Sequence, residues 1–206
     1  MLLEKLSVGV MGVNCYITGD KDEAIVIDPG ANSEKICAFL TENDIKVKYV
    51  VLTHCHFDHI SAAEDVLEFT GAELIASKNE AENLLNENVN MTGRFSKKVF
   101  KREADIYVSE GDIIKSGNTS FTVIETPGHT SGGMCLYLKD ENVVFTGDTL
   151  FCESIGRSDF PSGNFNDLML SIKNKLLKLP PKTRVLPGHD METTIENEIK
   201  NNPYLK

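Results

Sequence analysis

All five histidines of the chain lie in three short segments that are typical of metal sites. One is the HxHxDH pattern His54-Cys55-His56-Phe57-Asp58-His59, and the others are Pro127-Gly128-His129 and Pro187-Gly188-His189. A carboxylate stands between the last two, in Thr146-Gly147-Asp148. Imidazole and carboxylate groups together suit zinc, iron or manganese. Because unrelated histidines would rarely all fall in such segments, we expect a metal site made of His54, His56, Asp58, His59, His129, Asp148 and His189.

The spacing inside the HxHxDH segment indicates two metal centres rather than one. Side chains two residues apart lie on the same side of an extended chain, so His54 and His56 can face one centre. Asp58 and His59 follow where the chain turns into a helix, so they can face a second. Two metal ions that share a water molecule lower its pKa towards neutrality, which makes hydrolysis the expected chemistry. We expect Asp58 to be catalytic, both as a ligand and as the acceptor that orients this water.

Each predicted ligand segment follows an apolar stretch that resembles a β-strand. Val47–Thr53 leads to His54, and Phe121–Glu125, Val143–Phe145 and Val185–Leu186 precede the later ligands. Glycine comes immediately before three of the ligands, where it permits a tight turn of the backbone. Rigid strand ends therefore place the chemistry along one edge.

The remaining elements predict two packed sheets with helices outside them. The further strands expected are Leu2–Val10, Asn14–Thr18, Glu23–Asp28, Glu73–Ala76, Ile106–Val108 and Met134–Leu138. Helices are expected at Ser33–Asn43 with Ser33 as N-cap, Ile60–Phe69, Lys78–Asn88, Phe165–Lys178, and after a capping box of Thr193 and Glu196. Strands followed by helices in each half predict an α/β fold in one domain, residues 1–206.

Composition narrows the class of protein. The chain has 206 residues, of which 41% are hydrophobic and 25% charged, as in an ordinary globular domain. A net charge of −10 argues against a nucleic-acid partner and against binding to anionic membranes. We find neither a secretory signal nor an apolar run long enough to cross a membrane. The five cysteines are odd in number and include no CxxC pair, so we expect a reducing, cytoplasmic setting.

The ordered ligand segments resemble the metallo-β-lactamase superfamily over nearly the whole chain. The resemblance implies an αββα sandwich of two mixed sheets, with helices on both outer faces and two divalent metal ions at one edge. It implies that His54, His56 and His129 bind the first metal. It assigns the second metal to Asp58, His59 and His189, with Asp148 bridging the two. Zinc is the first expectation, and iron or manganese would also suit these ligands.

Within the superfamily, the chain most resembles the small, single-domain glyoxalase II-like hydrolases. Asp148 stands where the best-known β-lactamases have cysteine, and Gly156-Arg157-Ser158-Asp159 resembles the GR(S/T)D signature of these hydrolases. The resemblance implies a small acyl-thiol substrate, a thioester such as S-lactoylglutathione. Full-length glyoxalase II enzymes also carry a C-terminal helical domain that binds glutathione. Only residues 190–206 follow His189, so we expect no such domain, which argues against glutathione as the carrier.

Several alternatives remain beside the thioester hydrolase. The GR(S/T)D segment is shared with persulfide dioxygenases, which hold a single iron and consume oxygen. A lactonase would use the same metal ligands. A β-lactamase is disfavoured because no export signal is present, and an RNA-processing nuclease because the chain is acidic. The alternative of another class is a non-catalytic metal-binding or sensor protein, although closed structural sites usually have four ligands, often cysteines.

Three further features have two interpretations each. Arg157 could bind a substrate carboxylate or form an ion pair with Asp159. Cys55 lies between two predicted ligands, so alternation points it away from the metals and into the core. The basic segment Arg94–Arg102 could attract anionic substrates, but such segments are more often solvated loops.

Overall fold

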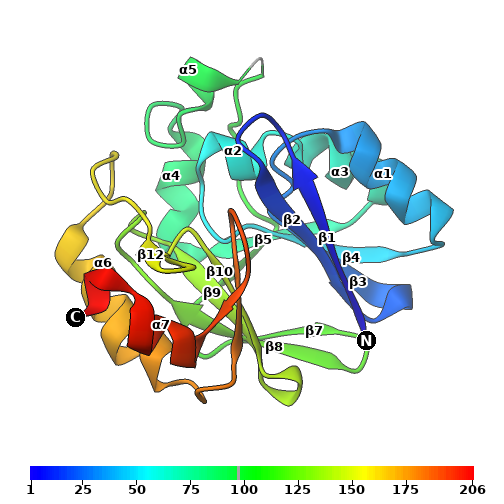
Figure 1. The fold of residues 1–206 in the computed structure, drawn as a ribbon. Helices are drawn as coiled ribbons and strands as arrows, with labels where there is room; N and C mark the ends of the chain where they lie inside the picture. The colour runs from blue at the N-terminus through cyan, green and yellow to red at the C-terminus, as the bar shows by residue number, and fades with distance from the viewer. Residues whose placement is uncertain (97) are drawn as a thin grey trace.

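The computed structural model describes residues 1–96 and 98–206, which form two six-stranded sheets packed face to face (Figure 1). The first sheet has the strand order β1 (Leu2–Val8), β2 (Val13–Gly19), β3 (Ala24–Ile27), β4 (Val47–Val51), β5 (Glu73–Ser77), β6 (Ile106–Val108). The second has the order β14 (Thr193–Thr194), β13 (Arg184–Pro187), β10 (Val143–Gly147), β9 (Met134–Leu138), β8 (Thr119–Glu125), β7 (Ile113–Ser116). Both sheets contain parallel and antiparallel pairs, as the mixed sheets of the prediction require.

Helices cover the outer face of each sheet (Figure 1). The first sheet is covered by α1 (Ser33–Glu42), α3 (Ala63–Thr70) and α4 (Ala81–Leu85), and the second by α6 (Phe165–Asn174) and α7 (Ile195–Asn201). Two short helices, α2 (Phe57–Ile60) and α5 (Thr92–Phe95), and the small hairpin of β11 (Leu150–Phe151) and β12 (Ser154–Ile155) complete the described α-helices and strands. The predicted αββα sandwich is confirmed.

Alternation along the strands explains why three apolar layers form. In β3, Ile25 and Ile27 pack between the sheets against Phe121 and Phe145, whereas Val26 packs beneath the helices of the first sheet. All four residues of β3 are apolar and buried, as expected for a strand that is covered on both faces. The space between the sheets is therefore filled, and functional groups can gather only at its edges.

Several predicted helix boundaries were wrong for local reasons. Ser33 is the first helical residue and not the cap; Asn32 precedes it, and its side chain accepts a hydrogen bond from the Gly9 amide at 2.8 Å. The expected capping box at Thr193 is also wrong. Thr193 pairs with β13 as part of β14, and the helix is capped by Thr194, which accepts from the amide of Asn197 at 3.2 Å.

Three predicted helices are shorter or divided. The helix expected at Ile60–Phe69 begins earlier as α2 and restarts as α3, and the helix expected at Lys78–Asn88 starts as a 3₁₀ turn and ends at Leu85. The helix expected at Phe165–Lys178 ends at Asn174 and continues as a 3₁₀ turn. Among residues 1–96 and 98–206, no helix has both the length and the apolar character needed to cross a membrane. The cytoplasmic setting stays a prediction.

Candidate metal centre

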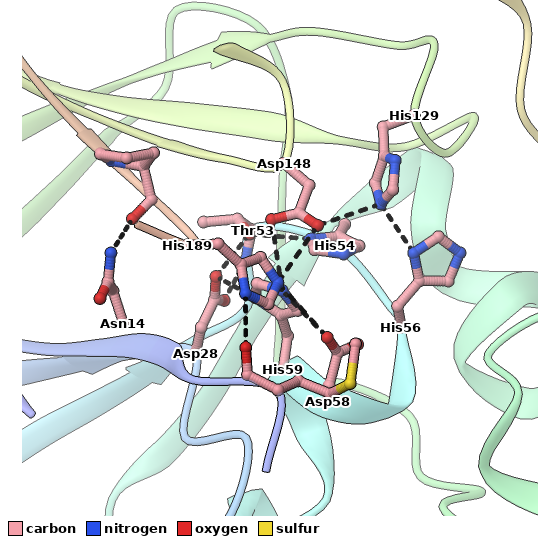
Figure 2. A network of polar contacts seen from close by, with 12 residues as sticks. Asn14, Asp28, Thr53, His54, His56, Asp58, His59, His129, Asp148 and His189 are labelled. Atoms are coloured by element: carbon pink, nitrogen blue, oxygen red, sulfur yellow. Dashed lines mark hydrogen bonds and ion pairs between the residues drawn. The ribbon is translucent and has the colours of Figure 1, made fainter. Parts of the chain in front are cut away.

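The predicted ligands come from both sheets and meet at one edge of the sandwich (Figure 2). The first sheet contributes the segment after β4, which carries His54 and His56, and the helix α2, which carries Asp58 and His59. The second contributes the loop between β8 and β9, with His129, and the ends of the parallel strands β10 and β13. Because those strands are parallel neighbours, Asp148 and His189 emerge side by side, and the Gly188 amide donates to the Gly147 carbonyl at 2.8 Å.

The seven side chains include the two sets that the resemblance implied, and a further group of Asp28, His54 and His59 overlaps both. The potential ligand atoms of His54, His56 and His129 lie within 4.8 Å of one another, and those of Asp58, His59 and His189 form a second such group. Asp148 lies between the groups. Its Oδ2 is 3.6 Å from His129 Nε2 and 3.6 Å from His189 Nε2, and its Oδ1 is 3.3 Å from His59 Nε2.

Hydrogen bonds to the protein fix the tautomer of four of the histidines. His59 Nδ1 lies 2.9 Å from a carboxylate oxygen of Asp28, His129 Nδ1 2.6 Å from the carbonyl of Arg157, and His189 Nδ1 3.2 Å from the carbonyl of Met11. Those oxygens only accept, so each Nδ1 carries the proton. His54 Nδ1 donates to Thr53 Oγ1 at 3.0 Å, because that hydroxyl gives its own proton to Asp28. When the ring is neutral, each Nε2 therefore has a free lone pair that faces the centre.

Buried atoms without partners show that these residues fit metal ions. Among the described residues, His54 Nε2 and Asp148 Oδ1 are buried and have no hydrogen-bond partner. His56 Nδ1 and His129 Nε2 face each other at 2.8 Å, as do His59 Nε2 and His189 Nε2 at 3.3 Å. Buried polar atoms left unpaired are costly, and converging lone pairs repel one another. A cation in each group satisfies both conditions, so the donor set fits two metal ions.

The electrostatics differ between the two groups. Burial lowers the pKa of His54 well below its usual value and that of His56 to about 3, and neighbouring imidazoles add to the effect. These histidines are therefore neutral, which is the form that binds metal. Burial also acts against charge on His59, but Asp148 and Asp28 outweigh it and raise its pKa. The pKa of Asp148 is lowered because the histidines overcome the effect of burial. The carboxylates around the second group thus favour positive charge there, which also favours a metal cation.

Sequence reasoning missed Asp28, which supports both groups from behind. Its carboxylate is buried at the end of β3 and accepts from the Thr53 amide at 2.7 Å, the Thr53 hydroxyl at 2.6 Å and His59 Nδ1 at 2.9 Å. It thereby orients His59 directly and His54 through Thr53 (Figure 2). The sequence signal was an acid directly after a buried strand, since Asp28 ends the predicted strand Glu23–Asp28.

Gly30 lets the helix α2 pack closely against the chain that follows Asp28. A Cβ at Gly30 would overlap the backbone carbonyl of Asp58, so the helix that carries Asp58 and His59 would have to move. We expect Gly30→Ala to lower the free energy of unfolding by about 1–3 kcal/mol and to reduce metal content, because overpacking shifts the backbone. Urea unfolding and metal analysis test this. Gly71→Ala is the control: its positive φ of 70° strains the backbone at the end of α3, but a Cβ there meets nothing within 4 Å, so metal content should stay unchanged. Equal metal loss in both variants would contradict the role of Gly30.

Arg157 forms the ion pair that the sequence left open as one of its two roles. Its guanidinium donates to Asp159 at 2.8 and 2.7 Å and lies 3.8 Å from the centroid of the Phe160 ring. Both charged side chains are exposed, and such pairs contribute little to stability. The contact supports the structural role, and binding of a substrate carboxylate by Arg157 stays a prediction.

Two variants separate these roles. We expect Arg157→Ala and Asp159→Ala to lower the free energy of unfolding only slightly and equally, and to leave KM unchanged. The measurements are urea unfolding and steady-state kinetics on an acyl-thiol that carries a carboxylate. A KM that rises for Arg157→Ala alone would instead show that the guanidinium holds the substrate.

An open groove of about 600 Å³ adjoins the second group at Asp58. One wall is the turn between β1 and β2, where Val10 is fully exposed, and the other contains Phe57 and Phe95, whose ring centroids are 5.0 Å apart. The groove offers a substrate an apolar surface beside the metal ligands.

Cys55 and the basic segment Arg94–Arg102 have the simpler of the roles considered from the sequence. Cys55 is fully buried, as expected, and burial raises the pKa of its thiol well above the usual value. In the basic segment, Lys98, Lys101 and Arg102 pair with acidic side chains, which is typical of a solvated loop. Lys97, which belongs to that segment, lies outside the described residues.

Residues 8–189 match the family model described as the metallo-beta-lactamase superfamily. The chain is 34% identical to the probable metallo-hydrolase YqgX of Bacillus subtilis, covering 100% of this chain and 98% of that one. It is 35% identical to the hydroxyacylglutathione hydrolase GloC of Haemophilus influenzae, again over 100% of this chain and 98% of the relative. These relatives have the same extent as the chain.

Several solved structures have the same fold as this chain. The B3 metallo-beta-lactamase BLEG-1 superposes with a TM-score of 0.93 at 33% identity and covers both chains completely. ETHE1 from Myxococcus xanthus superposes with a TM-score of 0.84 at 31% identity, over 100% of this chain and 84% of that one. TTHA1623, solved in a di-iron-bound form, gives 0.85 at 29% identity, over 98% and 100% of the two chains.

Proposed function

Because the chain belongs to the metallo-beta-lactamase superfamily, we propose that it is a dinuclear metal-dependent hydrolase that cleaves thioesters, small acyl-thiols such as lactoyl-thiols. The observation that carries the proposal is the orientation of the imidazoles. In four histidines, Nδ1 donates to an acceptor of the protein, and Nε2 points towards the site. Asp148 lies in this site between the two groups of ligands. A non-catalytic site closed by four ligands would not need seven.

The residues have distinct roles in this proposal. His54, His56 and His129 hold one metal ion, Asp58, His59 and His189 hold the other, and Asp148 bridges them. When bound, the two divalent ions lower the pKa of a water molecule and polarise the substrate carbonyl. Asp58 Oδ2 lies 3.4 Å from His189 Nε2, where its free lone pairs can hold and orient that water. The apolar groove beside Asp58 receives the body of the substrate.

The nature of the leaving group supports a thioester. All five histidines of the chain belong to the ligand set or its immediate surroundings, so none is spare to protonate a leaving group. A thiolate departs without prior protonation far more readily than an alkoxide or an amine, because thiols are stronger acids. The relative named hydroxyacylglutathione hydrolase, which matches the chain from end to end, supports the same substrate class.

Kinetic assays on purified, metal-loaded protein test this proposal. We expect hydrolysis of S-D-lactoylglutathione or of a simpler acyl-thiol, with loss of turnover when a chelator removes the metal. His56→Ala should lose the same activity, and Asp22→Ala, at an exposed acid, should keep it. Turnover of a β-lactam or a lactone with no thioester hydrolysis would contradict the thioester assignment. Tight metal binding with no turnover of any acyl substrate would support the sensor protein instead.

A second candidate is a persulfide dioxygenase that holds one iron. The neighbour solved in a di-iron-bound form shows that iron suits a closely similar fold, and the Gly156-Arg157-Ser158-Asp159 segment resembles that class as well. The two functions consume different reagents. Oxygen consumed with a persulfide, at one iron per chain, would favour the dioxygenase, whereas thioester turnover without oxygen uptake would favour the hydrolase.

A further inference from the structure

A buried carboxylate outside the ligand set joins the two loops that carry the first group of histidines. Glu80 ends a 3₁₀ turn (Lys78–Glu80) that follows β5, and only 1% of it is exposed. An acid this deeply buried is rare unless its oxygens are fully paired. Its position is not explained by capping of the helix α4, because no backbone amide of that helix donates to its side chain.

The partners of Glu80 lie next to predicted ligands in both sheets. Thr130, which follows His129, donates its hydroxyl to Glu80 Oε1. The amide and the thiol of Cys55, which stands between His54 and His56, face the same carboxylate. One acid thus contacts the residue after one ligand and the residue between two others.

A third contact and one glycine hold this arrangement in place. Asn83 donates from Nδ2 to Glu80 Oε2 and also to the hydroxyl of Ser131 at 2.9 Å, in the same loop as His129. A Cβ at Gly132 would overlap the backbone of Asn79 and Glu80, so the loop lies directly on this segment. All the surrounding side-chain groups are donors, which suits a carboxylate and not an amide.

We propose that Glu80 is a positioning residue for the first metal group, which sets the separation of His56 and His129 by tying Cys55 and Thr130 to one carboxylate. The two ligand loops belong to different sheets, and His56 Nδ1 and His129 Nε2 lie 2.8 Å apart across the gap. The inference rests on the metal-binding part of the proposed function, and it predicts an effect on one metal site rather than on both.

The test compares Glu80→Gln with a matched variant at another buried carboxylate. Glu198 is fully buried and accepts from Thr193 Oγ1 at 2.7 Å, Asn202 Nδ2 at 2.8 Å and the amide of Glu153 at 3.0 Å, none of which flanks a ligand. Zinc affinities are measured by chelator competition as two successive constants, cobalt substitution gives a ligand-field spectrum, and urea unfolding of metal-free protein measures stability.

We expect both variants to destabilise the metal-free fold and only Glu80→Gln to weaken one zinc constant, by roughly 10–100-fold, with an altered cobalt spectrum. Thr130→Val is the second variant if Glu80→Gln does not fold, and it should change the same constant. Unchanged constants in both Glu80→Gln and Thr130→Val, or an equal loss in Glu198→Gln, would overturn the inference. Wild-type protein that binds no metal would instead contradict the proposed function.

Discussion

Asp148→Ala should lose one of the two metal ions and almost all hydrolysis. Asp148 Oδ1 lies 3.3 Å from His59 Nε2, and its Oδ2 lies 3.6 Å from Nε2 of both His129 and His189, so its loss removes a carboxylate that faces both groups. The remaining carboxylate of the second group, Asp58, would then face His59 and His189 alone. Losing several kcal/mol of transition-state stabilisation corresponds to a fall in kcat/KM on the order of a thousandfold or more.

Metal analysis and steady-state kinetics on the thioester check this result together. Asp22→Ala is the matched control, because that aspartate is 82% exposed and distant from every predicted ligand in the chain's fold. It should retain both metal ions and wild-type activity. Two tightly bound metal ions in Asp148→Ala, with activity preserved, would show that Asp148 does not bridge.

Asp28→Asn should weaken metal binding although Asp28 is not among the seven predicted ligands. The wild-type carboxylate accepts three hydrogen bonds, two from Thr53 and one from His59 Nδ1. An amide presents one acceptor and one donor, so at least one of these donors is left facing an NH₂ group. If that donor is His59, its proton moves to Nε2, the atom that must bind the metal.

We expect Asp28→Asn to lower metal affinity by roughly 10–100-fold, as loss of a supporting hydrogen bond typically does. Chelator competition measures the affinity, and the second group should suffer most because His59 contacts Asp28 directly. Thr53→Val is the comparison variant: it releases His54 Nδ1 and removes one hydrogen bond to Asp28, but it keeps the contact between Asp28 and His59, so it should affect the first group more. Wild-type affinity at both sites in Asp28→Asn would contradict this account of the tautomers.

The candidate ligand segments could be located from the sequence because their signals are local. His54, Asp148 and His189 follow the ends of apolar strands, and the HxHxDH spacing predicts two groups without knowledge of the fold; that these residues bind metal stays a prediction. The strands between the layers were found for the same reason, since strands buried on both faces, such as β3, give continuous apolar runs.

The residues that support the ligands could not be found in this way. Asp28 contacts His59 only because β3 and β4 are parallel neighbours, and Glu80 meets Thr130 across 50 positions of sequence. Short edge strands were also missed. In β7 only alternate residues are buried, and β14 has two residues, so neither gives a pattern stronger than that of a loop.

The most direct test of the central claim is native mass spectrometry of the purified chain during titration with zinc. Seven converging side chains in two groups predict that two ions bind per chain, and that Asp148→Ala binds fewer. A single ion per chain at saturating zinc, in the wild type and in Asp148→Ala alike, would contradict a dinuclear centre.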